Sequence, residues 1–366
     1  MSTRAAISGR IAQDRPSRPV VAMLDAIAAA TTTGSVAQAG SRLPEAVTAL
    51  AKAGVDPLEV GGVVSGTIDA MTRRLIDLAI EEMGEPPVPW AWLALGSAAR
   101  REQGIGTDQD HALAYDPQGQ PLEALDEYFR RLAEFVTSGL EAAGIPRCHA
   151  GVVAVNQALR RPLEHWVEAF ETWMADPRIE AVRQTTILFD HRRVAGPLDV
   201  ERTLRRIISS SPERPAFVGR LRHMAIQARP RRHLRLPRRI DLKHDGLMQI
   251  VTLARIVAVE GDIPETGTIE RLQRAAERGL LDAGSADRLA AAFGVMWRVR
   301  LEHQIAAAAA GEAPSDLVSV RTPELRIQLG DAFGSIREAL GAFLQGPVLP
   351  AMIRRPTRTP SLKPAA

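Results

Sequence analysis

Three short apolar runs and one long amphipathic run follow one another between residues 90 and 155. The apolar runs are WAWLAL at 90–95, DHALAY at 110–115 and GVVAV at 151–155, and each has the length of a β-strand. Between the second and the third, residues 122–143 carry apolar side chains at three- and four-residue steps, which predicts a helix. This order predicts a compact α/β unit of strand, strand, helix and strand.

The segments on both sides of this unit show helical periodicity. Apolar residues recur at helical spacing from about Pro19 to Met83, and nearly every segment after Pro162 does the same. We therefore expect a mostly helical α+β protein in which a small mixed sheet forms a core between an N-terminal helical domain and a C-terminal helical bundle. The expected division is an N-terminal helical region at 1–84, the core at 85–205, a helical substrate-binding domain at 206–346 and a disordered tail at 347–366.

The composition limits the cellular setting. Apolar residues make up 45% of the chain, but no run approaches the roughly 20 apolar residues that a membrane span needs. The N-terminus lacks the apolar stretch of a secretory signal, and the single cysteine, Cys148, cannot form an internal disulfide. These features predict a soluble cytoplasmic protein without a membrane partner.

The charge balance argues against nucleic acid as the main partner. Lysine and arginine number 46 against 43 aspartate and glutamate, so the net charge is small. One local cluster, RPRRHLRLPRR from Arg229 to Arg239, leaves two interpretations open. It is either a solvated connector or a site for nucleic acid.

The candidate catalytic residues lie between the first two predicted strands. Asp108 and Asp110 open the second strand, and a spacing of two places both carboxylates on the same face. Such a pair can hold two Mg²⁺ ions and thereby bind a triphosphate. Gly96 and Ser97 end the first strand, where a small turn with a hydroxyl and backbone amides can contact phosphate oxygens. Together these residues predict a nucleotide-phosphate site facing a metal site.

The residues between the two halves of this site leave two readings open. Arg100 or Arg101 can contact phosphate while Glu102 orients an arginine, or the three residues form a solvated helical turn. Histidine ligands are not expected, because His111 points to the opposite strand face. Cys148 and its neighbour His149 are not expected to form a nucleophile pair, since adjacent strand residues face opposite ways.

The run GSAARREQGIGTDQD resembles bacterial nucleotidyltransferases that are often fused to CBS domains. The later segments CHAGVVAVNQALRRPLEHW, ILFDHRRVAG and DLKHDGLMQIVTLARIVAV add to the resemblance, which covers roughly residues 85–345. These proteins look like relatives of the uridylyltransferase that modifies the PII signalling protein. The resemblance implies a DNA polymerase β-like nucleotidyltransferase core followed by a helical domain that holds the substrate. No CBS module precedes the core in this chain, so adenylate sensing is not expected.

The resemblance also implies roles for individual residues. Gly96 and Ser97 match the phosphate-binding turn of the family, and Asp108 and Asp110 match its metal-binding pair. The segment DLKHDG at 241–246 is similar to an Asn-Leu-Lys motif, in which Lys243 would approach a phosphate or the acceptor. A salt bridge at a helix start is the alternative role for Lys243.

Enzymes of this superfamily commonly use a third carboxylate as a metal ligand or general base. The third predicted strand offers Asn156 and no acid, so Asp190 in TTILFDHRRVAG is the expected third catalytic and metal-binding residue. If Asp190 instead pairs with Arg192 or Arg193, its role is structural.

The sequence therefore predicts a nucleotidyltransferase that depends on Mg²⁺ (or Mn²⁺) and transfers a nucleoside monophosphate from an NTP to an acceptor hydroxyl. A protein is the first candidate for the acceptor, in signalling or regulation. The alternative is a catalytically weak signalling module that senses nucleotides. The sequence does not indicate which base is used.

Overall fold

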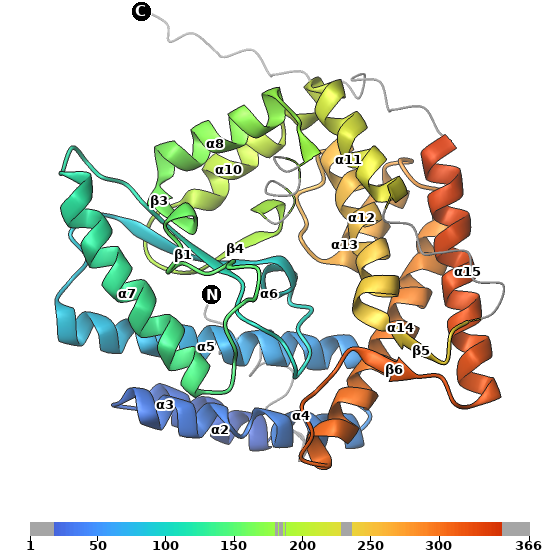
Figure 1. The fold of residues 1–366 in the computed structure, drawn as a ribbon, viewed down its shortest axis with the longest axis horizontal. Coiled ribbons are helices and arrows are strands. Elements are labelled where there is room, and N and C mark those ends of the chain that lie inside the picture. Colours follow the sequence, from blue (N-terminus) through green and yellow to red (C-terminus); the bar gives the residue numbers. More distant parts are fainter. Residues whose placement is uncertain (1–17, 180–181, 183–185, 187, 228–235, 346–366) are drawn as a thin grey trace, which may run out of the picture.

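The computed structural model describes residues 18–179, 182, 186, 188–227 and 236–345. Helices surround a small four-stranded sheet, as the sequence predicts for a mostly helical α+β protein (Figure 1). The predicted tail and most of the Arg229–Arg239 cluster lie outside the described residues.

The elements follow one another in an order that separates the sheet from the late helices. The N-terminal helices are α2 (Arg18–Ala29), α3 (Thr33–Gly40), α4 (Leu43–Lys52) and α5 (Pro57–Met83). The elements of the sheet region are β1 (Trp90–Leu95), α6 (Gly96–Arg100), β2 (His111–Tyr115), α7 (Leu122–Ala142), β3 (Arg160–Pro162), α8 (Leu163–Ala175) and β4 (His191–Ala195). The later elements are α10 (Val200–Ile208), α11 (Pro215–Gln227), β5 (Arg239–Asp241), α12 (Met248–Glu260), α13 (Thr268–Glu277), α14 (Ala283–Ala309), β6 (Leu317–Ser319) and α15 (Pro323–Gln345).

The main sheet has the strand order β3-β2-β1-β4. Strand β1 runs antiparallel to both β2 and β4, and β2 runs parallel to β3, so the sheet is mixed. The pairing of Leu95 with His191 and of Ala94 with His111 brings the end of β1 beside the starts of β2 and β4. Residues that follow β1 and precede the other two strands therefore meet at one edge of the sheet.

The prediction of a third strand at 151–155 is wrong. Gly151 has a φ of +72°, and the segment turns, with the Asn156 amide donating to the Val153 carbonyl at 2.9 Å. The third strand is instead β3, which starts at the buried Arg160. The guanidinium of Arg160 donates to the carbonyls of Ala154 and Val155 at 2.9 and 2.7 Å and so holds the turn against the strand.

The two faces of the sheet are covered by different helices. Trp92 and Tyr115 belong to one core, which they share with α5, α7 and the other N-terminal helices. Leu93 and Ala112 belong to a second core with α8 and α10 on the other face. This alternation is the pattern expected for strands buried on both sides. The N-terminal helices therefore share a core with the sheet. The domain division expected at residue 84 stays a prediction.

The late helices form a third core, centred on α12, α14 and α15. This core contacts the N-terminal helix α5, because Trp297 of α14 donates its indole N–H to the Pro57 carbonyl at 2.7 Å. Gln304 of α14 also accepts the Ile105 amide at 3.1 Å, in the loop that leads to the acid pair. Within the described part of the chain, no helix is both long and apolar enough to cross a membrane.

Candidate functional site

Asp108 and Asp110 lie side by side at the edge of the sheet where β1 ends. Candidate ligand atoms of Asp108, Asp110 and Cys148 all lie within 4.8 Å of one another, and all three residues are half-buried. Gln109 between the acids is buried on the other side, where its amide donates to the carbonyls of Thr137 and Ile145 at 3.1 and 2.7 Å. The spacing of two thus places both carboxylates on one side of the backbone.

His111 takes no part in this acidic group. Its Nδ1 accepts the Ala154 amide at 3.0 Å, so its Nε2 carries the proton and donates to Gln109 Oε1 at 2.9 Å. Burial lowers the pKa of His111 to about 3, which keeps the ring neutral. The prediction that His111 faces away from the acids is confirmed.

The turn after β1 lies directly against Asp110. Gly96 has a φ of +52°, and a side-chain carbon at this position would lie 3.5 Å from Asp110 Oδ2. The Leu95 amide donates to the Asp110 carbonyl at 2.9 Å, which fixes the two segments together. The Gly96 amide donates to the Asp190 carbonyl at 2.9 Å and is therefore already used. Ser97, the next residue, is half-buried and adds a hydroxyl to this turn.

The environment of Asp110 opposes its negative charge. Burial and then the nearby charge of Asp108 raise the pKa of Asp110 to about 6. The positive charges of Lys243 and Arg100 and a hydrogen bond from the Cys148 thiol act in the opposite direction. Burial, with a contribution from Asp110, raises the pKa of Cys148 to about 11, so the thiol keeps its proton. A site of this kind gains stability when a cation joins the carboxylates.

Lys243 reaches this site from the late part of the chain. It lies in a π-helical turn, Leu242–Leu247, and is half-buried. The alternative role, a salt bridge at a helix start, is filled by its neighbours, because Asp241 pairs with His244 Nδ1 at 3.0 Å. Among the described residues no carboxylate forms an ion pair with Lys243. Its charge therefore remains available to the acid pair and to an anion bound there.

Arg100 and Glu102 do not form the solvated turn that was one of the two readings. Arg100 is 8% exposed and donates to Glu102 at 2.7 Å and to Asp190 at 2.6 Å. Glu102 accepts the backbone amide of Thr268 at 2.7 Å, at the start of α13. Arg101 differs, since it is exposed and has a left-handed backbone with a φ of 60°. Of the two arginines, Arg101 is thus the one that solvent and ligands can reach.

Asp190 is the centre of a buried cluster of arginines. It is fully buried, and its Oδ1 accepts from Arg271 at 2.6 Å while its Oδ2 accepts from Arg100 at 2.6 Å and Arg255 at 2.5 Å. Burial alone would raise the pKa of Asp190, but the three guanidinium charges outweigh burial and hold the pKa well below its usual range. The cluster joins α6 and the start of β4 to α12 and α13.

The predicted third carboxylate therefore lies in a different setting from Asp108 and Asp110. Both oxygens of Asp190 are bound to arginines, and Asp190 is not part of the group that Asp108 and Asp110 form. The geometry matches the structural alternative, but with other arginines than expected. Arg192 pairs with Asp69 of α5 at 2.8 Å, and Arg193 donates to backbone carbonyls.

Two family models match the chain and together span most of it. The first, described as "Putative nucleotidyltransferase DUF294", matches residues 41–180, and the second, described as "Putative nucleotidyltransferase substrate binding domain", matches residues 202–343. The chain belongs to this nucleotidyltransferase family. Membership indicates nucleotidyl transfer as the general reaction and a nucleotide as a substrate. No curated protein matches the chain.

The first match begins inside the predicted N-terminal region and the second covers the late helices, so the acid pair and Lys243 come from different matched segments of the family. Loop residues near the acids also contact the second segment. A side-chain carbon at Gly106 would lie 2.9 Å from Pro314, and one at Gly104 would overlap Gln304. The glycines allow the two segments to approach closely.

The donor atoms at the acid pair fit the divalent metal that nucleotidyltransferases typically use. Two half-buried carboxylates supply hard oxygen ligands, which Mg²⁺ and Mn²⁺ prefer. Burial and the charge of Asp108 raise the pKa of Asp110, and a divalent cation would offset both effects.

Sequence reasoning missed Cys148 and the arginine cluster. Cys148 is 38 residues from Asp110, and the bridge of Gln109 to Arg147 brings it to the acids. Arg255 and Arg271 lie in helical periods that carry no sign of a distant carboxylate. Arg255 does lie in the last segment of the family resemblance, and this was the one sign in the sequence that it has a role.

Proposed function

We propose that this protein transfers a nucleoside monophosphate from an NTP to an acceptor hydroxyl and releases pyrophosphate. The observation that supports the proposal best is that Gly96 lies beside Asp110, whose carboxylate groups with that of Asp108. Asp108 and Asp110 would hold Mg²⁺ or Mn²⁺. Such an ion, when bound, neutralises phosphate charge and favours departure of pyrophosphate.

The other residues of the site bind and orient the nucleotide in this proposal. Ser97 donates its hydroxyl to a phosphate oxygen, since the Gly96 amide is already bound to Asp190. Gly96 brings the turn next to the Asp110 carboxylate with a backbone φ of +52°, a conformation that favours glycine. Lys243 and the exposed Arg101 supply positive charge to the phosphates. Arg100 acts as a positioning residue, because its guanidinium Nε donates to Glu102 and its Nη1 donates to Asp190.

Asp190 is better suited to positioning than to proton transfer. A carboxylate whose pKa is held far below neutrality is a weak base, and three arginines occupy its oxygens. Its backbone carbonyl accepts the Gly96 amide, so the cluster fixes the turn that receives the phosphates. A catalytic role for Asp190 stays a prediction that only activity measurements on variants test.

The acceptor is proposed to be a protein, and the role to lie in signalling or regulation. The late helices, which match the substrate-binding model, would hold it, and they contact the loop that carries the acids. We further propose that the enzyme works in the cytoplasm, consistent with a single cysteine in 366 residues.

A label-transfer assay tests this proposal. The full chain is incubated with cell extract, Mg²⁺ and one α-³²P-labelled nucleotide at a time (ATP, UTP, CTP or GTP). We expect one nucleotide to label a macromolecule, and we expect Asp110→Asn to reduce labelling by a factor of about 100 or more. Folded wild-type protein that labels nothing with any nucleotide contradicts the proposal. Nucleotide binding without pyrophosphate release would support the nucleotide-sensing alternative instead.

A further inference from the structure

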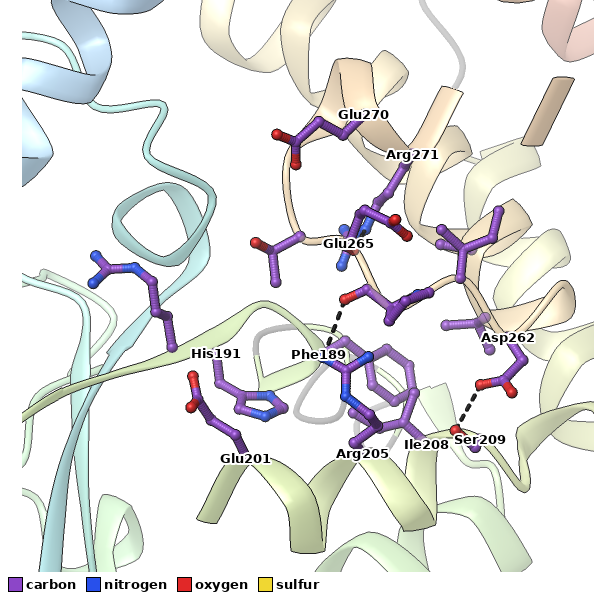
Figure 2. Close-up of a pocket in the computed structure, with 16 residues that line it drawn as sticks. Phe189, His191, Glu201, Arg205, Ile208, Ser209, Asp262, Glu265, Glu270 and Arg271 are labelled. Carbon is purple, nitrogen blue, oxygen red and sulfur yellow. Dashed lines mark hydrogen bonds between the residues drawn. The ribbon is translucent and has the colours of Figure 1, made fainter. Parts of the chain in front are cut away.

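A cavity of about 310 Å³ lies between the start of β4, helix α10 and the connection from α12 to α13 (Figure 2). Asp108 and Asp110 do not line it, so it is separate from the proposed metal site. Its volume lies at the lower end of the range for small-molecule pockets. Its walls combine an apolar surface with charged groups of both signs.

The apolar part of the wall comes mostly from buried residues. Phe189, Val259 and Ile263 are 4%, 5% and 7% exposed, and Ala258 and Ile208 complete this surface. Burying an apolar group against it removes that group from water and is favourable. The cavity therefore suits a ligand with an apolar portion.

One arginine of the lining can offer its charge to a ligand. Arg205 extends from α10 across the cavity, and its Nη2 donates to the Pro264 carbonyl at 3.2 Å (Figure 2). No carboxylate of the described residues forms an ion pair with Arg205. The other two arginines of the lining differ, because Arg271 is paired with Asp190 and Arg192 with Asp69. Arg205 is thus the group that can receive a carboxylate of a ligand.

The cavity also offers hydrogen-bond acceptors. Glu265 Oε1 accepts from Arg274 at 3.0 Å, but its buried Oε2 has no hydrogen-bond partner. A buried acceptor without a donor is unfavourable, so a ligand N–H would be stabilising there. Glu201 and Glu270 add carboxylates to the lining. His191 donates its Nδ1 proton to the Leu188 carbonyl at 2.9 Å, which leaves Nε2 of the neutral ring as a further acceptor.

We propose that this cavity binds a free α-amino acid with an apolar side chain. Its carboxylate pairs with Arg205, its ammonium group donates to Glu265 Oε2, and its side chain lies on the surface formed by Phe189 and Ile263. A nucleotide fits less well, because its phosphates would meet four acidic residues and a single unpaired arginine. A ligand with only a positive charge would leave Arg205 without a partner.

Binding at this cavity is close enough to the Asp190 cluster to influence it. Arg271 lines the cavity and donates to Asp190, whose carbonyl holds the Gly96 amide. An amino acid bound at the cavity would therefore contact a chain of residues that ends at the proposed phosphate turn. The binding itself does not depend on the proposed transferase activity.

Isothermal titration of the full chain with L-leucine, L-methionine and L-phenylalanine tests the proposal. Each amino acid is compared with its methyl ester, which lacks the carboxylate, and its N-acetyl derivative, which lacks the ammonium charge. We expect at least one free amino acid to bind. We expect each of its two derivatives to bind with an affinity at least about tenfold lower. If none of the three amino acids binds, or if the derivatives bind equally well, the proposal is wrong.

Two variants test which residue binds the carboxylate and which binds the ammonium group of the ligand. Each variant has a matched control outside the cavity. Arg205→Gln should remove the preference for the free acid over the methyl ester, whereas Arg202→Gln, an exposed arginine of the same helix, should not. Glu265→Gln should remove the preference for the free amine over the N-acetyl derivative, whereas Glu277→Gln, which also contacts Arg274, should not. Equal losses in variants and controls would overturn the assignment.

Discussion

At the scale of single residues, the site combines Asp110, whose pKa is raised, with Ser97 and Lys243, which can bind an anion. The sequence predicted the relation of Asp108 to Asp110, because a spacing of two fixes the side on which both project. It could not predict Cys148, because the contact depends on how residues 109 and 147 pair. The raised pKa of Asp110 likewise depends on burial, which no local pattern specifies.

Asp110→Asn should stabilise the protein without metal at neutral pH. The pKa of Asp110 rises from 3.8 to about 6 on folding, so the wild type loses stability as the pH rises from about 4 to about 6. Asparagine has no such charge, and we expect a gain on the order of 2 kcal/mol at pH 7.5. At pH 5 the carboxylate is already ionised in the unfolded chain, so the gain should fall only to roughly half, and it should vanish below the unfolded pKa of 3.8.

Urea denaturation in the presence of EDTA at the two pH values measures this difference. The Asp77→Asn variant, at a more exposed carboxylate on α5, is the control and should change stability little. Destabilisation by Asp110→Asn at pH 7.5 would show that its carboxylate is not held in an unfavourable setting.

At the scale of elements, the sequence predicted most helices of the late segment and both central strands. Periodicity succeeded where an element is long or apolar, as in α7 and β1. It failed at the third strand, because β3 is three residues long and begins with arginine. Glycines at 330, 334 and 341 weaken the helical pattern of α15, and its packing on α14 compensates for them.

Two adjacent glycines of α5 should respond oppositely to alanine. A side-chain carbon at Gly61 would lie 2.9 Å from the Trp297 ring and 3.4 Å from the Gln103 carbonyl, whereas nothing lies within 4 Å of one at Gly62. Gly62→Ala should therefore stabilise by roughly 0.5 to 1 kcal/mol through helix propensity. Gly61→Ala should destabilise, by about 1 kcal/mol or more, because α5 and α14 would have to separate.

Thermal unfolding of both variants beside the wild type checks this pair. Equal stabilisation by the two substitutions would mean that α5 and α14 do not pack as closely as the contact of Gly61 with Trp297 requires.

At the scale of the whole molecule, buried ion pairs hold the sheet region against the late helices. The Asp190 cluster brings together residues 100, 190, 255 and 271, and Glu102 adds a bond to the start of α13. Contacts over such separations in sequence are not encoded in any local period, so the sequence left Asp190 between a catalytic and a structural role. The two-part family match is consistent with segments that function together.

Asp190→Asn should destabilise the protein by about 3 to 5 kcal/mol, because it leaves three buried arginines without their shared counter-charge. Urea denaturation at pH 7 measures the loss, again beside Asp77→Asn. A loss below about 1 kcal/mol would contradict the central place of Asp190 in joining the two segments.

The most direct test of the proposed site is a crystal structure of the full chain with Mn²⁺ and a non-hydrolysable NTP analogue, with anomalous scattering to locate manganese. We predict a manganese peak bound by Asp108 and Asp110, at about 2.0 to 2.3 Å from their oxygens, with the triphosphate against Ser97 and Lys243. A triphosphate bound elsewhere, or manganese without contact to either acid, would contradict the account.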